Sequence, residues 1–227
     1  MTEKAIIFDA STLISFAMNG LLDKIVKLKE SFNGKFLITK EVEYEIVKRP
    51  IKIKRFELEA LKLDQLIKDK ILEFPDSFGE NDKEISEKTQ QLLDLANKTF
   101  QKKDKDLHLI DLGETSCLVL SKMLTEKNIP NLLAIDERTT RMLCEKPENL
   151  KKLLQKKNKA TITYKKENLK YFQGFKIIRS TELGYIAYKK GLIKLKGNLV
   201  LDALLYALKF KGCSISGDEI EEIKRMK

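Results

Sequence analysis

The stretch Ala5-Ile-Ile-Phe-Asp9-Ala-Ser-Thr12, close to the N-terminus, indicates the fold. Its four consecutive apolar residues show no polar alternation, which is typical of a strand covered by helices on both faces. Similar short runs recur between segments with helical periodicity, and this alternation predicts an α/β fold around a mostly parallel sheet. We expect strands at 5–8, 36–38, 132–135 and 175–178.

The segments between and after these runs predict helices. The last three should begin near Thr181, Asn198 and Ser216; Gly191 ends the first of them, and Ser216 with Glu219 forms a capping box for the last. The earlier helices are expected at 12–30, 40–48, 54–70, 80–103, 112–127, 137–145 and 148–157.

The composition narrows the classes of protein. A chain of 227 residues with 42% hydrophobic and 34% charged residues can bury a sizeable core, which excludes a low-complexity chain. The net charge of +10 favours an anionic partner. The most apolar stretch, 199–210, is interrupted by Asp202 and is shorter than the roughly 20 residues of a membrane helix. We therefore expect a cytoplasmic protein without a membrane helix.

Two segments read as additions to one domain spanning 1–227. Residues 50–106 are rich in charges of both signs and predict a helical insertion with solvated faces. Residues 146–175 hold nine lysines against two glutamates, so most of the excess positive charge of the chain lies there. The three cysteines, Cys117, Cys144 and Cys213, show no CxxC pairing and are interpreted as packing residues.

Acidic residues follow two of the predicted strands. Asp9 ends the first, and Asp136 follows the run at 132–135. Ligands of open α/β sheets bind beyond the carboxyl ends of the strands, so two such acids would converge there. Alternatively, each Asp caps the helix that follows it.

Two glutamates have the same ambiguity. Glu45 lies beside Ile46 at the edge of a buried stripe, or else on an acidic helix face balanced by Lys48 and Arg49. Glu114 stands in the first turn of an apolar helix, where it would complete a capping box with Asp111. Each acid therefore has a structural and a functional interpretation.

The four acidic segments, taken in order, resemble the PIN-domain nucleases. The similarity is to a prokaryotic subgroup that includes ribonuclease toxins of toxin-antitoxin pairs. It covers 5–48, 107–142 and 174–227, so the first added segment and nearly all of the second lie outside it. The motifs that carry it are Phe8-Asp9-Ala-Ser11-Thr12, Val42-Glu-Tyr-Glu45-Ile46, Leu112-Gly-Glu114, Ile135-Asp136-Glu-Arg-Thr-Thr-Arg141 and Gly174 to Gly184.

The resemblance implies a three-layer fold and a metal-dependent endoribonuclease. The catalytic and metal-binding residues would be Asp9, Glu45, Glu114 and Asp136, and their hard carboxylate oxygens suit Mg²⁺ or Mn²⁺. The cation would activate water for attack on an RNA phosphodiester. Supporting roles fall to Ser11 or Thr12, which would bond a carboxylate, and to Arg141, which would pair with Glu137 or a phosphate. A homodimer and an antitoxin or other protein partner are also implied.

The lysine-rich segment is a candidate RNA-contacting surface. Its lysines lie near Tyr164, Tyr171, Phe172 and Phe175, which could stack on unpaired bases. A solvated helix face with core aromatics is the alternative. The candidate RNA-binding residues are Lys151, Lys152, Lys156, Lys157, Lys165 and Lys166.

Other classes fit less well. A haloacid-dehalogenase phosphatase needs a second Asp at the position of Ser11, and the glycines form neither a phosphate-binding loop nor a dinucleotide motif. The open alternative is a non-catalytic PIN-like scaffold that binds RNA or protein and uses the acids as helix caps. A toxin and a housekeeping RNA-processing enzyme are not separated by this sequence.

Overall fold

The computed structural model describes residues 3–226 and contains a central sheet of four parallel strands. The strand order is β2 (Lys35–Leu37), β1 (Ala5–Phe8), β5 (Asn131–Ala134), β7 (Ile177–Ile178), and every neighbouring pair is parallel. The α/β class and the parallel sheet predicted from the sequence are therefore confirmed. Register pairs Phe8 with Ala134, which brings the carboxyl ends of β1 and β5 to one edge.

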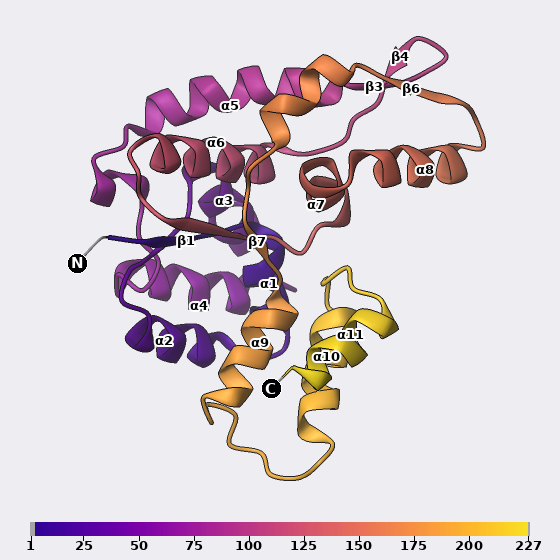
Figure 1. Ribbon diagram of the computed structural model, residues 1–227. Helices are drawn as coiled ribbons and strands as arrows, with labels where there is room; N and C mark the ends of the chain where they lie inside the picture. The colour runs from indigo at the N-terminus through magenta and orange to yellow at the C-terminus, as the bar shows by residue number, and fades with distance from the viewer. Residues whose placement is uncertain (1–2, 227) are drawn as a thin grey trace.

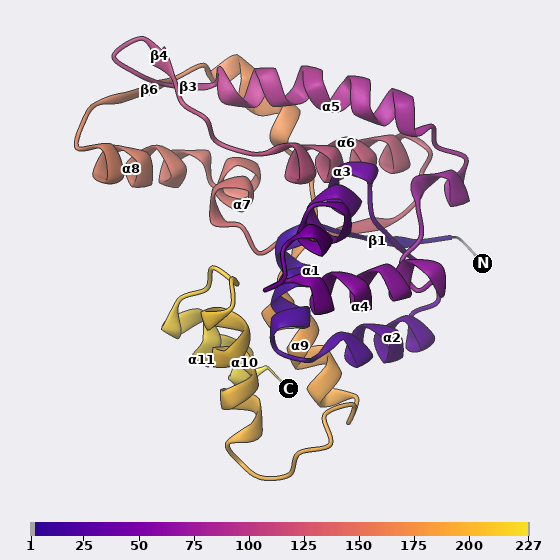
Figure 2. The same cartoon turned by 180° about the vertical axis from the view of Figure 1, so that it is seen from behind.

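Helices cover both faces of this sheet and make three layers (Figures 1 and 2). One side carries α5 (Asp82–Asn97) and α6 (Leu112–Glu126), and the other carries α1 (Ala10–Met18), α2 (Leu22–Ser31) and α9 (Ser180–Lys189). Ile7, Phe8, Leu37 and Leu133 on the strands are completely buried between these layers. The apolar strand runs are thus explained by burial on both faces.

Several predicted helices are found close to their expected bounds. The range 40–48 forms the short helix α3 (Lys40–Glu43) followed by a π-helical turn, η1 (Tyr44–Lys48). Gly191 follows α9, and the capping box of Ser216 and Glu219 is present. The other confirmed helices are α4 (Glu57–Lys68), α6, α7 (Arg138–Glu145), α8 (Pro147–Asn158), α10 (Val200–Phe210) and α11 (Gly217–Arg225).

Two of the predicted helices are wrong in extent. The range 12–30 is divided into α1 and α2 at Gly20, whose φ of +66° is favoured by glycine and ends the first helix. The range 80–103 is helical only to Asn97, because Phe100 begins a strand, β3 (Phe100–Lys102). The last predicted strand, 175–178, is reduced to β7.

The two added segments are joined in space. A second, antiparallel sheet has the order β4 (Lys105–Asp106), β3, β6 (Ile162–Tyr164), so the segment at 50–106 is not purely helical. Phe100 stacks on Tyr164 with ring centroids 5.2 Å apart, and the Asn168 amide donates to Thr99 Oγ1 at 3.1 Å. The end of the first segment and the second segment therefore form one lobe beside the central sheet, in which 166–172 is the 3₁₀ segment η4 (Lys166–Phe172), whereas α4 packs against α1 and α2.

The C-terminal helices form a separate small cluster. Leu205 of α10 and Ile220 of α11 are buried against Tyr185 of α9. The Arg179 guanidinium binds Glu182 and, at 2.6 Å, Glu219, which attaches α11 to the start of α9. No helix within residues 3–226 has the length and apolar character needed to cross a membrane.

Candidate functional site

Asp9 is the most buried acid with a free oxygen at the edge of the sheet. It directly follows β1 and caps α1, with Oδ2 accepting from the Ser11 amide at 3.0 Å and also from the Ser11 hydroxyl. Oδ1 is buried and has no hydrogen-bond partner among the described residues. Burial raises the pKa of Asp9, although the Ser11 hydrogen bonds oppose the shift. An unpartnered buried carboxylate oxygen is costly unless a ligand pairs with it.

Glu45 approaches from the π-helical turn η1. Its Oε1 accepts from the Gly113 amide at 3.2 Å, at the N-terminus of α6, where the helix dipole favours a negative charge. Burial, followed by the charge of Asp9, raises the pKa of Glu45 to about 7. Glu45 lies at the buried edge, with its side chain turned toward α6. Of the two cations that could balance it, Lys48 pairs with Glu43 instead, whereas Arg49 is close enough to lower the pKa of Glu45.

Glu114 completes the capping box predicted for it and also has a second hydrogen bond. Its Oε2 accepts from the Asp111 amide at 3.2 Å, which is the return bond of the capping box, and from Thr140 Oγ1 of α7 at 2.8 Å. Burial, then the charges of Asp9 and Glu137, raises the pKa of Glu114 to about 8. Capping therefore accounts for one bond of a carboxylate that also faces Asp9.

Asp136 occupies a different environment from the other three acids. It is completely buried, with Oδ1 accepting from the Ser180 amide at 2.7 Å and Oδ2 from Ser15 Oγ at 2.8 Å. The prediction that Asp136 caps the next helix is wrong, because Glu137 caps α7 through the Thr140 amide at 2.8 Å. Asp136 instead links α1 to the start of α9 and lies close enough to Asp9 to raise its pKa slightly.

Of the three predicted supporting residues, Ser11 contacts the acids, whereas Thr12 and Arg141 have polar atoms that are unpartnered within the described chain. Ser11 bridges the two aspartates, since its hydroxyl donates to Asp9 and accepts from the Asp136 amide at 3.1 Å. The Thr12 hydroxyl is buried and bonds no described residue. Arg141 was expected to pair with Glu137 or a phosphate. It forms no ion pair with Glu137 or any other residue of 3–226, its Nε is buried without a partner there, and the phosphate contact stays a prediction.

Two residues near the acids were missed by the sequence interpretation. Glu137 lies beside Asp136 in the fourth motif and raises the pKa of Glu114, so its charge belongs to the cluster. The buried Cys117 thiol donates to the Phe8 carbonyl at 3.6 Å. Burial, and then the charges of Asp9, Glu45 and Glu114, raise the pKa of this thiol well above its ordinary value. The spacing of one helical turn from Glu114 was the available signal for Cys117.

The donor set fits a hard divalent cation, although the side chains are not arranged around one. Within 3–226, no group of three or more His, Cys, Asp or Glu residues is placed so that it could hold a metal ion. The unpartnered Asp9 Oδ1 and the raised pKa values of its neighbours are nevertheless what a cation would relieve. Binding would require Glu45 and Glu114 to turn toward that oxygen.

No protein-family profile, curated protein or solved structure matches this chain.

The raised pKa values predict how stability depends on pH. The folded protein keeps protons on Glu45 and Glu114 up to about pH 7 and 8, whereas the unfolded chain releases them near 4.5. The free energy of unfolding should therefore fall as pH rises from about 4.5 to 8. Glu219, with a pKa of about 2, acts in the opposite direction and only below that range.

Thermal unfolding with EDTA at pH 5.5, 7 and 8.5 checks this. A Glu45→Gln, Glu114→Gln double variant should show a flatter profile than the wild type. Equal slopes for the two proteins would contradict the assignment of these raised pKa values.

Proposed function

We propose that this chain is a PIN-like, metal-dependent endoribonuclease. The observation that carries the proposal is the free, buried Oδ1 of Asp9, with Glu45 and Glu114 held near it by separate helices. Burial first, and then the charge of Asp9, raises the pKa of both Glu45 and Glu114, and acids perturbed in this way are typical of a functional site. The resemblance of the acidic motifs to PIN nucleases supplies the reaction class.

The side chains have distinct duties in this proposal. Asp9 presents an oxygen that Ser11 fixes in place, while Glu45 and Glu114 supply further ligands and Glu137 adds negative charge. Asp136 holds α1 and α9 together behind Asp9. A bound Mg²⁺ or Mn²⁺ would supply activation of water and stabilisation of charge developing on the phosphate. Thr140 orients Glu114 from α7.

A packing feature gives a test of Glu45 that spares the fold. A Cβ built on Gly113 would lie 2.6 Å from Glu45 Oε1, the end of a flexible side chain. Gly113→Ala should therefore displace the carboxylate while favouring the helix by up to about 1 kcal/mol. We expect an unchanged or higher melting temperature with cleavage reduced about tenfold or more.

Gly217→Ala is the matched control, because a Cβ there meets nothing closer than the Tyr206 hydroxyl at 3.9 Å. RNA cleavage rates and thermal melts of both variants make the comparison. Wild-type cleavage by Gly113→Ala would remove Glu45 from the site.

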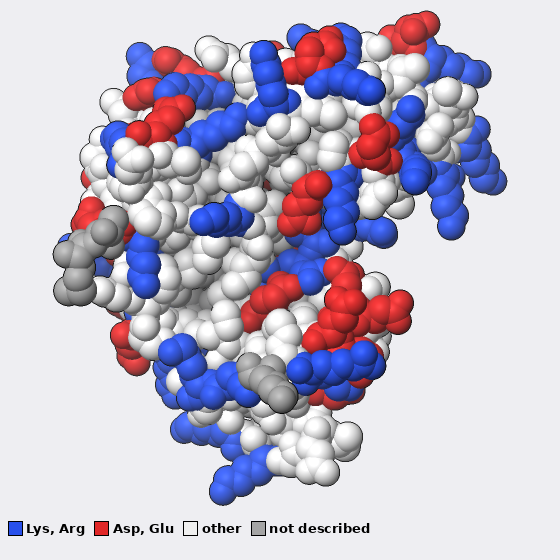
Figure 3. Space-filling view, in the orientation of Figure 1, with Lys and Arg blue, Asp and Glu red and all other residues white. Residues whose placement is uncertain are grey.

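The lysine-rich lobe offers the RNA surface. The lysines of α8 project at the upper right of Figure 3, and Lys152, Lys156 and Lys157 are exposed. None of the six candidate lysines forms an ion pair with any residue of 3–226. Lys151 is held over the Tyr164 ring at 5.3 Å and is less free than the others.

The expected stacking aromatics are mostly used in packing. Phe172 is completely buried, and Tyr164 is stacked on Phe100 and bonded to Glu148. Tyr171 is 42% exposed and is the member of the group best placed to meet a base. Lysine charge, more than stacking, should therefore dominate binding at this lobe.

Replacing Lys152, Lys156 and Lys157 by Gln should weaken RNA binding for all sequences alike. Lysine contacts phosphates as a point charge, so the slope of log K against log salt should flatten by about 0.7 for each lost contact to a single strand. Binding isotherms at several salt concentrations measure this slope. Gln replacements of the exposed Lys189, Lys190 and Lys194, at and beyond the end of α9, serve as the control. An unchanged slope in the α8 variant would place the RNA path elsewhere.

The function itself is tested by incubating structured and single-stranded RNAs with the protein and Mn²⁺, Mg²⁺ or EDTA. Internal cleavage with a divalent cation, suppressed by EDTA, is the expected result. Cleavage that persists in EDTA, or no cleavage under any condition, would contradict the proposal.

A non-catalytic scaffold is the second candidate, and specific bonds favour it. Asp9 caps α1, Glu114 completes part of a capping box, and both oxygens of Asp136 are bonded within the protein. Such acids would gain nothing from a divalent cation, so metal-dependent stability separates the two functions.

The biological setting is proposed from the resemblance alone. A cytoplasmic ribonuclease toxin would be paired with an antitoxin protein, and a homodimer would be its assembly. A small gene adjacent to this one, whose product binds the chain and suppresses cleavage, would favour the toxin over an RNA-processing enzyme. Size-exclusion chromatography with light scattering would report the oligomeric state.

A further inference from the structure

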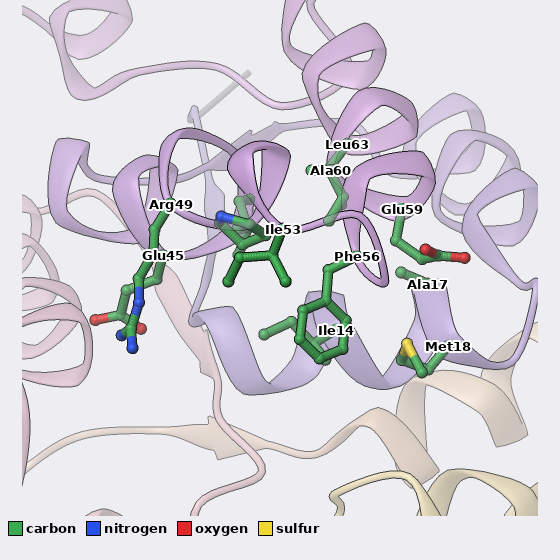
Figure 4. A pocket seen from close by; sticks show the side chains of 12 residues that line it. Ile14, Ala17, Met18, Glu45, Arg49, Ile53, Phe56, Glu59, Ala60 and Leu63 are labelled. Atoms are coloured by element: carbon green, nitrogen blue, oxygen red, sulfur yellow. The ribbon is translucent and has the colours of Figure 1, made fainter.

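An apolar cavity lies beside Glu45. It has a volume of about 330 Å³ and is bounded by α1 on one side and by η1 and the start of α4 on the other (Figure 4). Ile14, Ile53 and Phe56 form its middle, while Glu45 and Arg49 stand at one end and Glu59 at the opposite end. Its walls are thus apolar and its polar groups are confined to the two ends.

This distribution matches a nucleobase. A base has two apolar faces and carries its hydrogen-bonding groups on its edges, and its faces stack on aromatic side chains such as Phe56. The volume lies at the small end of the range for ligand pockets, roughly 300–1,000 Å³, which suits one ring system better than a helix of a partner protein.

The position of the cavity connects it to the acid site. Glu45 belongs to both, since it lines the cavity and its own pKa is raised by burial and then by the nearby charge of Asp9. A nucleotide with its base in the cavity would therefore have its phosphate close to the carboxylates. Arg49 is exposed at the same end, where a guanidinium can contact a phosphate.

Glu59 supplies a means of selection. It is half-buried and forms no hydrogen bond or ion pair with any described residue. An ionised carboxylate only accepts hydrogen bonds, so it favours an edge that carries amino or imino donors. Guanine offers two adjacent donors and cytosine or adenine an amino group, whereas the donor of uracil lies between two carbonyl oxygens.

We propose that this cavity is a base-binding subsite that takes one nucleotide beside the scissile phosphate and disfavours uracil. The inference rests on the proposed nuclease function and adds a specificity determinant to it. Phe56 stacks on the base and Glu59 reads its edge. The apolar side chain of a protein partner is the competing occupant, and it would show no dependence on the base.

The first test uses cleavage of a random-sequence RNA pool with Mn²⁺, with the cut ends sequenced. We expect uracil to be depleted about fivefold or more at one position next to the cut, the factor typical of one good base contact. Glu59→Gln should remove this depletion, because an amide both donates and accepts. Phe56→Ala should slow cleavage by about fivefold or more through lost stacking.

Glu57→Gln is the matched control, since Glu57 lies on the same helix and pairs with Lys54 at 2.9 Å outside the cavity. It should keep the wild-type rate and the wild-type depletion of uracil. Thermal melts of Phe56→Ala show whether that variant is folded, and Glu59→Gln tests the cavity without removing a packing side chain.

The second test measures binding without cleavage. Saturation-transfer NMR with the Asp9→Asn protein should show GMP binding more tightly than UMP, with the difference lost in Glu59→Gln. Binding of GMP without any RNA cleavage would support the base site and contradict the nuclease. Cleavage that is lost in Asp9→Asn but shows no base preference, and that does not change in Phe56→Ala or Glu59→Gln, would overturn the base site. The proposed nuclease function would then stand without it.

Discussion

Asp9→Asn should abolish metal-dependent RNA cleavage, with a loss on the order of 100-fold or more, while the protein stays folded. The carboxylate loses the charge that would hold a cation, and even groups one shell away from a metal typically contribute 10- to 100-fold. Asparagine is as good a helix cap as aspartate, so the bond from the Ser11 amide is kept. Initial cleavage rates with Mn²⁺ and melting curves with EDTA measure the two effects.

The burial of Asp9 makes the stability result informative. Because burial raises its pKa, a neutral side chain at this position should leave the melting temperature in EDTA unchanged or higher. Asp23→Asn, at an exposed acid paired with Lys24, is the control and should cleave normally. A fully active Asp9→Asn protein would exclude Asp9 as a ligand and with it the proposed site.

Glu114→Gln should remove most of the stabilisation that Mn²⁺ confers. A ligand that binds only the folded protein adds about 2.7 kcal/mol at 100 times its Kd. For a domain of this size each kcal/mol raises the melting temperature by roughly 2–4 °C, so the wild type should gain roughly 5–11 °C. Glutamine keeps an oxygen for the Asp111 and Thr140 bonds but is a poor ligand for the cation.

The variant also separates the two functions considered. Without metal, Glu114→Gln should melt at or above the wild-type temperature at pH 8, because it removes a carboxylate whose pKa burial raises to about 8. Glu126→Gln, at the exposed end of the same helix, should keep the full Mn²⁺ shift. If Glu114→Gln keeps the shift as well, Glu114 is a helix cap and the scaffold function gains support.

The local sequence pattern was sufficient to predict an element or its end where one short-range physical cause determines it. The apolar runs at 5–8 and 132–135 predict buried parallel strands because burial on both faces leaves no polar alternation. The capping box at Ser216 and the glycine after α9 set helix ends through short-range hydrogen bonds and φ preferences. The division of α1 from α2 was missed, although Gly20 was visible, because a single glycine is also tolerated inside a helix.

The pairing of the two added segments was beyond the sequence. β3 and β6 are separated by about 60 residues, and each is only three residues long, so neither shows a periodicity that separates it from a loop or a helix end. That pairing also decides which aromatic side chains are free to stack on a base. Tyr164 is not free, because its ring stacks on Phe100 once the two strands pair.

By itself the sequence determined the parallel sheet, most of the helices, the convergence of Asp9 and Asp136 on neighbouring strands, and the placement of the positive charge. Only the tertiary structure decided what each acid does. One carboxylate oxygen of Asp9 has no hydrogen-bond partner among the described residues, whereas both oxygens of Asp136 accept hydrogen bonds, from Ser15 and Ser180. The physical reason is that strand ends follow from local burial, while the partners of a carboxylate come from residues 44 and 121 positions away, which meet only when the layers pack.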